Sequence, residues 1–277
     1  MFGKLMKYEL RYLIRIFAPM WMAVITLCAL SRLLIRPNAE GTMYLEGIQA
    51  MVPLLILMLA VIAILTMMVA AAVVLLQRFY KGIYGDEGYL MFTLPVTTGS
   101  LIHSKALSAV LMLVISEVIT VVGVLIMVSY KEIWQLTGQT FGELFKFAMA
   151  MNGLSTAQAC VLVFWMVVAG VFVVTQGIYT VYFAISVGQL WKKHPIVGAI
   201  AAYYAITLLV GGLQAVLTEV FGASAMEVIF NLMGGGNTQY SAALAVILIA
   251  AALYSMMVTG IAFLGTKMIL DRRLNIQ

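Results

Sequence analysis

The feature that most constrains this chain is a long stretch that carries no charge. No charged side chain occurs between Glu46 and Arg78. A helix over this stretch would be roughly 45 Å long at ~1.5 Å per residue, whereas the hydrocarbon core of a bilayer is ~30 Å thick. A stretch this apolar is typical of a membrane span. Because the helix is longer than the bilayer is thick, we expect it to tilt or to protrude.

Apolar runs of this kind recur along the whole chain. Hydrophobic residues make up 64% of the sequence and charged residues 10%, whereas soluble domains contain about half and about a quarter, respectively. This composition excludes a soluble globular protein. It predicts an all-α polytopic membrane protein with six spans, at about 17–35, 50–78, 102–129, 157–187, 196–218 and 242–265.

The residues ahead of the first span have a different pattern. Lys4, Lys7, Arg11 and Arg15 recur at helical spacing, and apolar side chains follow the opposite face. A basic amphipathic helix beside a span is typical of the membrane interface. The sequence therefore predicts an interfacial amphipathic helix over 1–16 and a six-span transmembrane domain over 17–277.

The basic residues decide the orientation. Most of the 16 Lys and Arg residues lie at the two termini, in the segment 78–100 and around position 192. The positive-inside rule places these parts in the cytoplasm.

The segment 219–240 then lies on the outer side. It is too apolar for water and too short to span, which predicts re-entrant helices between spans five and six.

The segment 78–100, between the second and third spans, carries an unusual mixture of side chains. Gly85 or Asp86 can cap a short helix whose first turn is acidic, and Pro95 ends it. Such a helix favours docking of a soluble partner. The alternative is an interfacial belt of aromatic residues with snorkelling basic residues, which does not account for the acidic turn followed by apolar residues and a proline. The predicted docking residues are Tyr84, Asp86, Glu87, Tyr89, Met91 and Phe92.

At this segment the chain resembles a known family. The stretch Tyr84–Pro95, with the sequence YGDEGYLMFTLP, is similar to the intracellular loop of ATP-binding-cassette type-2 permeases, the six-span subunits of bacterial exporters. The resemblance implies that the loop carries a coupling helix, which sits in a groove of a cytoplasmic ATPase subunit. It also implies a homodimer or heterodimer in the inner membrane that forms the translocation pathway. An apolar pathway suits a hydrophobic or amphipathic substrate, such as a peptide, an antibiotic or a lipid.

Several chemistries lack their motifs. The sequence contains no GxxxxGK[ST], HExxH or GxSxG pattern, and its two cysteines and two histidines are isolated. We therefore expect no enzyme activity, metal or cofactor on this chain, and no nucleic-acid partner. ATP and Mg²⁺ would bind to the partner subunit.

One acid lies deep in a predicted span. Glu117 is a candidate for the translocation pathway, because intramembrane acids commonly face a bundle interior or a water-filled path. The alternative is a hydrogen-bonded glutamate that packs the spans together, with Ser116 and Thr120 close by.

Two other functions stay open, a secondary transporter and a non-transporting membrane scaffold. A secondary transporter would need more polar residues at midplane.

Overall fold

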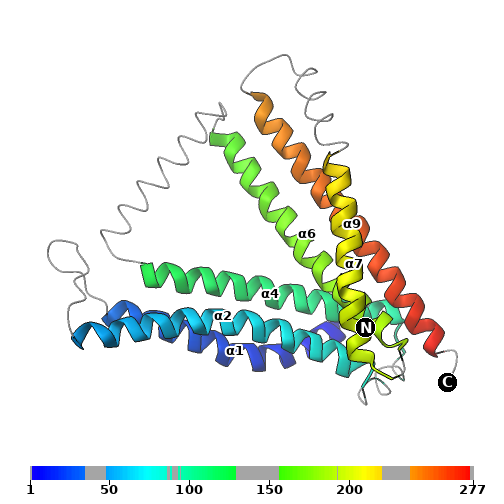
Figure 1. The fold of residues 1–277 in the computed structure, drawn as a ribbon, viewed down its shortest axis with the longest axis horizontal. Coiled ribbons are helices and arrows are strands. Elements are labelled where there is room, and N and C mark those ends of the chain that lie inside the picture. The colour runs from blue at the N-terminus through cyan, green and yellow to red at the C-terminus, as the bar shows by residue number, and fades with distance from the viewer. Residues whose placement is uncertain are drawn as a thin grey trace. The chain divides into compact units, whose positions relative to one another are not determined.

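The structure is a computed structural model that describes residues 2–34, 48–85, 88, 93, 95–128, 156–191, 193–219 and 238–274. Its described residues form long helices and no strand (Figure 1). Six of the helices are long and apolar enough to cross a membrane. The prediction of an all-α multi-pass membrane protein is therefore confirmed. The helices are α1 (Phe2–Leu34), α2 (Ile48–Ile83), α4 (Thr98–Val128), α6 (Thr156–Gly188), α7 (Pro195–Leu217) and α9 (Thr238–Leu274).

Helix boundaries differ most from the predicted spans at the two ends of the chain. Helix α1 begins at Phe2 and continues without a break through Pro19, so residues before the first span are not a separate element. Pro19 removes one backbone N–H, and the helix continues around it. Helix α9 runs past the predicted end at 265 to Leu274. The predicted coupling helix lies largely outside the described residues, as does the outer segment from 220 to 237.

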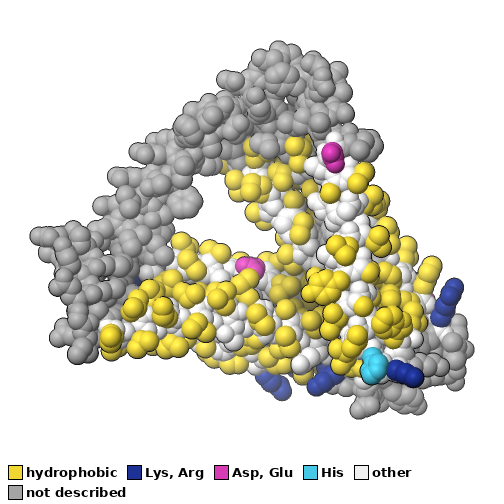
Figure 2. Space-filling view, in the orientation of Figure 1, with side chains coloured by type: hydrophobic (Ala, Val, Ile, Leu, Met, Phe, Trp, Pro, Cys, Tyr) yellow, Lys and Arg dark blue, Asp and Glu magenta, His cyan; other side chains and the backbone are white. Residues whose placement is uncertain are grey.

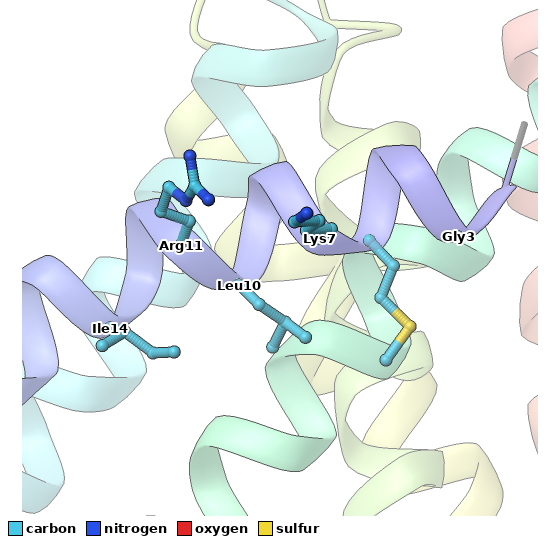
Figure 3. Close-up of a pocket in the computed structure, with 6 residues that line it drawn as sticks. Gly3, Lys7, Leu10, Arg11 and Ile14 are labelled. Atoms are coloured by element: carbon cyan, nitrogen blue, oxygen red, sulfur yellow. The ribbon is translucent and has the colours of Figure 1, made fainter.

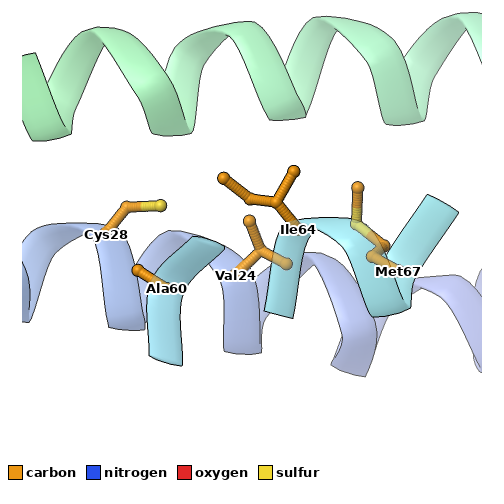
Figure 4. Close-up of a cluster of buried hydrophobic side chains, with 5 residues drawn as sticks. All are labelled: Val24, Cys28, Ala60, Ile64 and Met67. Carbon is orange, nitrogen blue, oxygen red and sulfur yellow. The ribbon is translucent and has the colours of Figure 1, made fainter. Parts of the chain in front are cut away.

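The chain divides into two compact units, and the first contains residues 1–78 and 111–144. Its core lies between α1 and α2, where Val24 and Cys28 meet Ala60, Ile64 and Met67 (Figure 4). These side chains form one buried apolar cluster between the two helices. The later part of α4 belongs to the same unit. The Trp21 indole N–H of α1 donates to the Ser116 hydroxyl of α4 over 3.0 Å.

The second unit contains residues 79–110 and 145–277. Within it, α6 packs along both α7 and α9. The turn from α6 to α7 is tight: a Cβ at Gly188 would lie 2.4 Å from the Ala199 amide nitrogen, so only glycine fits there. Pro195 begins α7, where its missing N–H costs nothing. The Tyr254 hydroxyl of α9 donates to the Val210 carbonyl of α7 over 2.6 Å. This hydrogen bond joins α7 to α9.

Buried hydroxyl groups are satisfied inside their own helices. Ser31, Ser108, Ser186 and Thr266 are fully buried, and each donates to a backbone carbonyl three or four residues earlier. Such bonds need no water, which suits a helix in lipid. Apolar side chains cover much of the visible surface instead (Figure 2). Soluble monomeric proteins rarely expose apolar surface this extensive.

Candidate site at the base of the 78–100 loop

Of the six predicted docking residues, Tyr84 is the one that the structure describes. It follows the last turn of α2, and its backbone N–H donates to the Tyr80 carbonyl. The other five, Asp86, Glu87, Tyr89, Met91 and Phe92, lie outside the described residues. The geometry that can be described is therefore that of the two ends of the loop, where it leaves α2 and enters α4.

The first end of the loop is attached to α6 by two contacts. Phe79 and Tyr182 stack face to face, with ring centroids 3.6 Å apart and planes at 9°. Both side chains are buried, with exposed fractions of 1% and 3%. One turn later, the Tyr84 hydroxyl donates to the Ser186 hydroxyl over 2.7 Å, and Ser186 in turn donates to the Tyr182 carbonyl. The end of α2 and the last two turns of α6 therefore form one packed and hydrogen-bonded group.

The second end of the loop is attached to α9. Thr97 precedes α4, and its hydroxyl accepts a hydrogen bond from the Ser100 backbone N–H, as a helix N-cap does. The Thr98 hydroxyl donates to the Asp271 carboxylate near the end of α9 over 2.7 Å. Gly99 lies beside the ring of Phe263, which would be 3.4 Å from a Cβ at this position. The start of α4 is thus fixed to α9.

One turn further along α4, His103 joins α4 to both α6 and α9. Its Nδ1 shares a short hydrogen bond with the Tyr179 hydroxyl of α6. Its ring stacks on Phe263 of α9, with centroids 4.2 Å apart. Tyr179 also meets Phe263 edge to face. These three rings form a cluster, which we call the aromatic clamp (His103, Tyr179 and Phe263).

A basic residue is buried beside the end of α2. Lys105 of α4 is 4% exposed, and its Nζ would lie 2.5 Å from a Cβ at Gly82 of α2. Glycine at position 82 leaves room for this ammonium group. The structure places the Lys105 side chain inside the helix packing and not at the surface.

The N-terminal helix is joined to the end of α2 within the first unit. Arg78 Nε donates to Glu9 Oε1 over 2.8 Å, and Arg78 Nη2 donates to Glu9 Oε2 over 3.1 Å. The side chains are 14% and 7% exposed, respectively. The Arg78 guanidinium also lies over the Tyr12 ring, 4.1 Å from its centroid. A bidentate pair with this little exposure fixes the direction of both helices.

Glu117 faces outward from its unit. Its side chain is exposed on α4, and it takes part in none of the hydrogen bonds or ion pairs found among the described residues. It does not bond to Ser116 or Thr120. Each of these donates its hydroxyl to a carbonyl of its own helix. Whether Glu117 serves the pathway or the packing of spans stays a prediction.

No group of three or more metal-binding side chains occurs in the part of the chain that the structure describes. A small apolar cavity of about 150 Å³ lies between α6, α7 and α9, lined by residues that include Thr180, Phe183 and Tyr254. Pockets for drug-sized molecules measure ~300–1,000 Å³, so this cavity alone is too small for such a substrate. The described contacts at the base of the loop hold the helix ends together.

Most residues at the base of the loop were not singled out from the sequence. Phe79 and Tyr182 lie far apart in the chain, and so do Glu9 and Arg78. One signal was available: Glu9 is the single acid in a basic segment and lies on its apolar face. A charge in that place needs a partner.

Searches of protein-family models, of curated proteins and of solved structures found no match to the chain.

Proposed function

We propose that this chain is the membrane-spanning permease subunit of an ATP-driven exporter, coupled to separate ATPase subunits through the 78–100 loop. The observation that carries the proposal is the attachment of both ends of this loop to spanning helices. The end of α2 is held on α6 by Phe79 and Tyr84. The start of α4 is held on α9 by Thr98 and on α6 and α9 by the aromatic clamp.

This attachment has a mechanical consequence. A loop with loosely held ends would absorb a push from a soluble partner by bending. Closely packed side chains have low compressibility and transmit strain. A displacement of the 78–100 loop is therefore passed to α6 and α9. Both of these spans lie far from the loop in the sequence. An interfacial belt needs no such connection, so the connection favours a docking loop.

The partners follow from the absent nucleotide motif and from the exposed surface. The sequence has no phosphate-binding loop, so ATP and Mg²⁺ bind to cytoplasmic ATPase subunits and this chain has no enzymatic role. Large apolar side chains on α7, such as Leu208 and Leu209, are 74% and 73% exposed. They face lipid or a second permease subunit. A pathway between two such subunits would accept a hydrophobic or amphipathic substrate.

The arrangement in the membrane is part of the same proposal. Both termini and the 78–100 loop face the cytoplasm of a bacterial cell, because the basic residues gather on that side. The N-terminal half of α1 lies at the cytoplasmic interface and continues directly into the first span. Re-entrant helices occupy the outer segment 219–240. In this arrangement the Glu9–Arg78 pair joins the interfacial part of α1 to the start of the docking loop.

Substitutions in the loop test the proposal. Buried aromatic anchors carry most of the energy of an interface, whereas charges at its rim control association rate and salt dependence. Phe92→Ala and Tyr89→Ala are each expected to weaken ATPase binding by roughly 2 kcal/mol or more if the residue is an anchor. Glu87→Lys should weaken it in a salt-dependent way. The readouts are co-purification of the ATPase, stimulation of its activity, and the amount of permease in the membrane.

The controls separate coupling from folding. Tyr204→Ala changes an exposed aromatic residue on α7, far from the loop in sequence, and should leave ATPase binding unchanged. If all three loop variants bind and stimulate the ATPase like the original chain, the loop is an interfacial belt. A chain that transports without any ATPase would be a secondary transporter, and one that binds an unrelated assembly and transports nothing would be a scaffold.

A further inference from the structure

The exposed surface of the N-terminal half of α1 carries charges of one sign. Lys4, Lys7, Arg11 and Arg15 are all exposed, and at 3.6 residues per turn they fall within an arc of about 80°. None of the four takes part in an ion pair in the described part of the chain. Glu9, the single acid of this segment, is buried and paired with Arg78. The ion pair thus removes the only negative charge from the surface and leaves a purely basic stripe.

An apolar hollow runs beside this stripe. It is shallow and open, with a volume of about 480 Å³, and it lies along one face of α1 (Figure 3). Figure 3 shows the side chains of Arg11 and Leu10 on different sides of the helix. Ile14, one turn closer to the span, is 46% exposed. The lining residues are Gly3, Met6, Lys7, Leu10, Arg11 and Ile14.

The position of the hollow along the helix matches that of the lipid headgroups. If residues 17–34 cross the bilayer, they cover about 27 Å, close to the ~30 Å of hydrocarbon. Arg11 then lies about 9 Å beyond Phe17 along the helix axis, and Lys7 about one turn further. Along the axis Ile14 lies between these charges and the hydrocarbon, and Leu10 lies between Lys7 and Arg11. A ligand that fits is negatively charged at one end and apolar along the rest.

We infer that this hollow binds an anionic phospholipid, with the headgroup phosphate between Lys7 and Arg11 and an acyl chain along Leu10 and Ile14. Basic clusters beside a span bind anionic lipids in this way. An acidic protein surface would match the charges but would leave the apolar side of the hollow unused. The inference goes beyond the proposed transport function and does not depend on it, because lipid binding requires no ATPase.

Native mass spectrometry of the purified full-length chain in detergent tests the inference. The probes are phosphatidylglycerol and phosphatidylcholine with the same acyl chains. We expect phosphatidylglycerol to bind more tightly. Each basic residue near an anionic lipid contributes a factor of roughly five, so Lys7→Gln with Arg11→Gln should weaken phosphatidylglycerol binding about 30-fold. Both side chains are exposed, so the variant should keep its helical circular dichroism and its elution volume.

A matched pair of substitutions controls for net charge. Lys193→Gln with Arg272→Gln also removes two exposed basic groups and should leave the affinity within about threefold, because neither residue lines the hollow. Ile14→Asn should weaken binding of the long-chain lipid, and soluble glycerol phosphate should not displace it.

Four results would overturn the inference. The first is unchanged phosphatidylglycerol binding by the Lys7 and Arg11 variant. The second is an equal loss in the control pair, which would indicate a general charge effect. The third is displacement by glycerol phosphate, which would indicate a phosphate site without a lipid. The fourth is a variant that keeps its lipid but loses an ATPase partner, which would assign the basic stripe to a protein contact.

Discussion

The ion pair between Glu9 and Arg78 gives the most specific prediction. Two hydrogen bonds of 2.8 and 3.1 Å join the two side chains, and both are largely buried, with exposed fractions of 7% and 14%. Glu9→Gln keeps the shape of the side chain and removes its charge. Guanidinium groups stay protonated in proteins, so the variant removes the Glu9 counter-charge from a buried cation.

The expected loss of stability follows from this geometry. Removing one partner of a buried pair costs ~3–5 kcal/mol. The Tyr12 ring, 4.1 Å from the guanidinium, stays in place and stabilises the remaining charge by ~0.5–2 kcal/mol. We therefore expect a loss near the lower limit, about 3 kcal/mol. At ~2–4 °C per kcal/mol for a chain of this size, the midpoint of thermal unfolding in detergent should fall by roughly 6–12 °C.

A double-mutant cycle separates the pair from other effects. Arg78→Gln alone should cost about as much as Glu9→Gln, and the double variant should cost less than the sum by ~2 kcal/mol or more. Glu219→Gln is the matched control, because it makes the same change at an exposed acid and should leave the midpoint unchanged. A drop below 2 °C for Glu9→Gln, or strict additivity of the two losses, would show that the Glu9–Arg78 pair does not stabilise the folded protein.

Three further predictions concern the base of the loop, the intramembrane acid and the topology. Phe79→Ala should destabilise the protein by ~3–5 kcal/mol because the ring is 1% exposed, whereas Tyr84→Phe loses one hydrogen bond and should cost ~1 kcal/mol; equal effects on the thermal midpoint would be inconsistent with the described packing. Glu117→Gln should leave the thermal midpoint unchanged, because the side chain is exposed; unaltered transport by this variant would exclude a pathway role for its charge. In a cysteine-free variant, a cysteine at Glu219 should react with an impermeant thiol reagent in intact cells and a cysteine at Lys193 should not, and the opposite labelling would reverse the proposed topology.

The six long helices could be predicted because the signal for a span is local. Apolar residues and their flanking charges lie in one continuous stretch, and the described boundaries of α2, α6 and α7 fall within a few residues of the predicted ones at most ends. Helix α1 differed because the basic segment and the span share one helical register. Charge pattern alone does not reveal whether the chain bends between them.

The base of the loop could not be predicted because its contacts join distant parts of the chain. In the sequence, the aromatic residues of the spans look alike. Tyr182 of α6 stacks on Phe79, whereas Tyr203 of α7 is 40% exposed. Nothing in the neighbouring sequence distinguishes these two tyrosines. His103 is an isolated histidine in the sequence. In the structure it lies beside Tyr179 and Phe263. Pairing of this kind depends on how the helices pack, which hydropathy does not encode.

The proposed function requires the 78–100 loop to dock on an ATPase. Site-specific photo-crosslinking in intact cells tests it most directly, with the photoreactive residue at Phe92 in one variant and at Leu209, an exposed position on α7, in the other. Position 92 is expected to yield an adduct with a subunit that contains a phosphate-binding loop, and position 209 is not. Adducts at position 92 only with lipid, or none with an ATPase, while the protein is present at normal levels, would show that the loop does not dock on an ATPase.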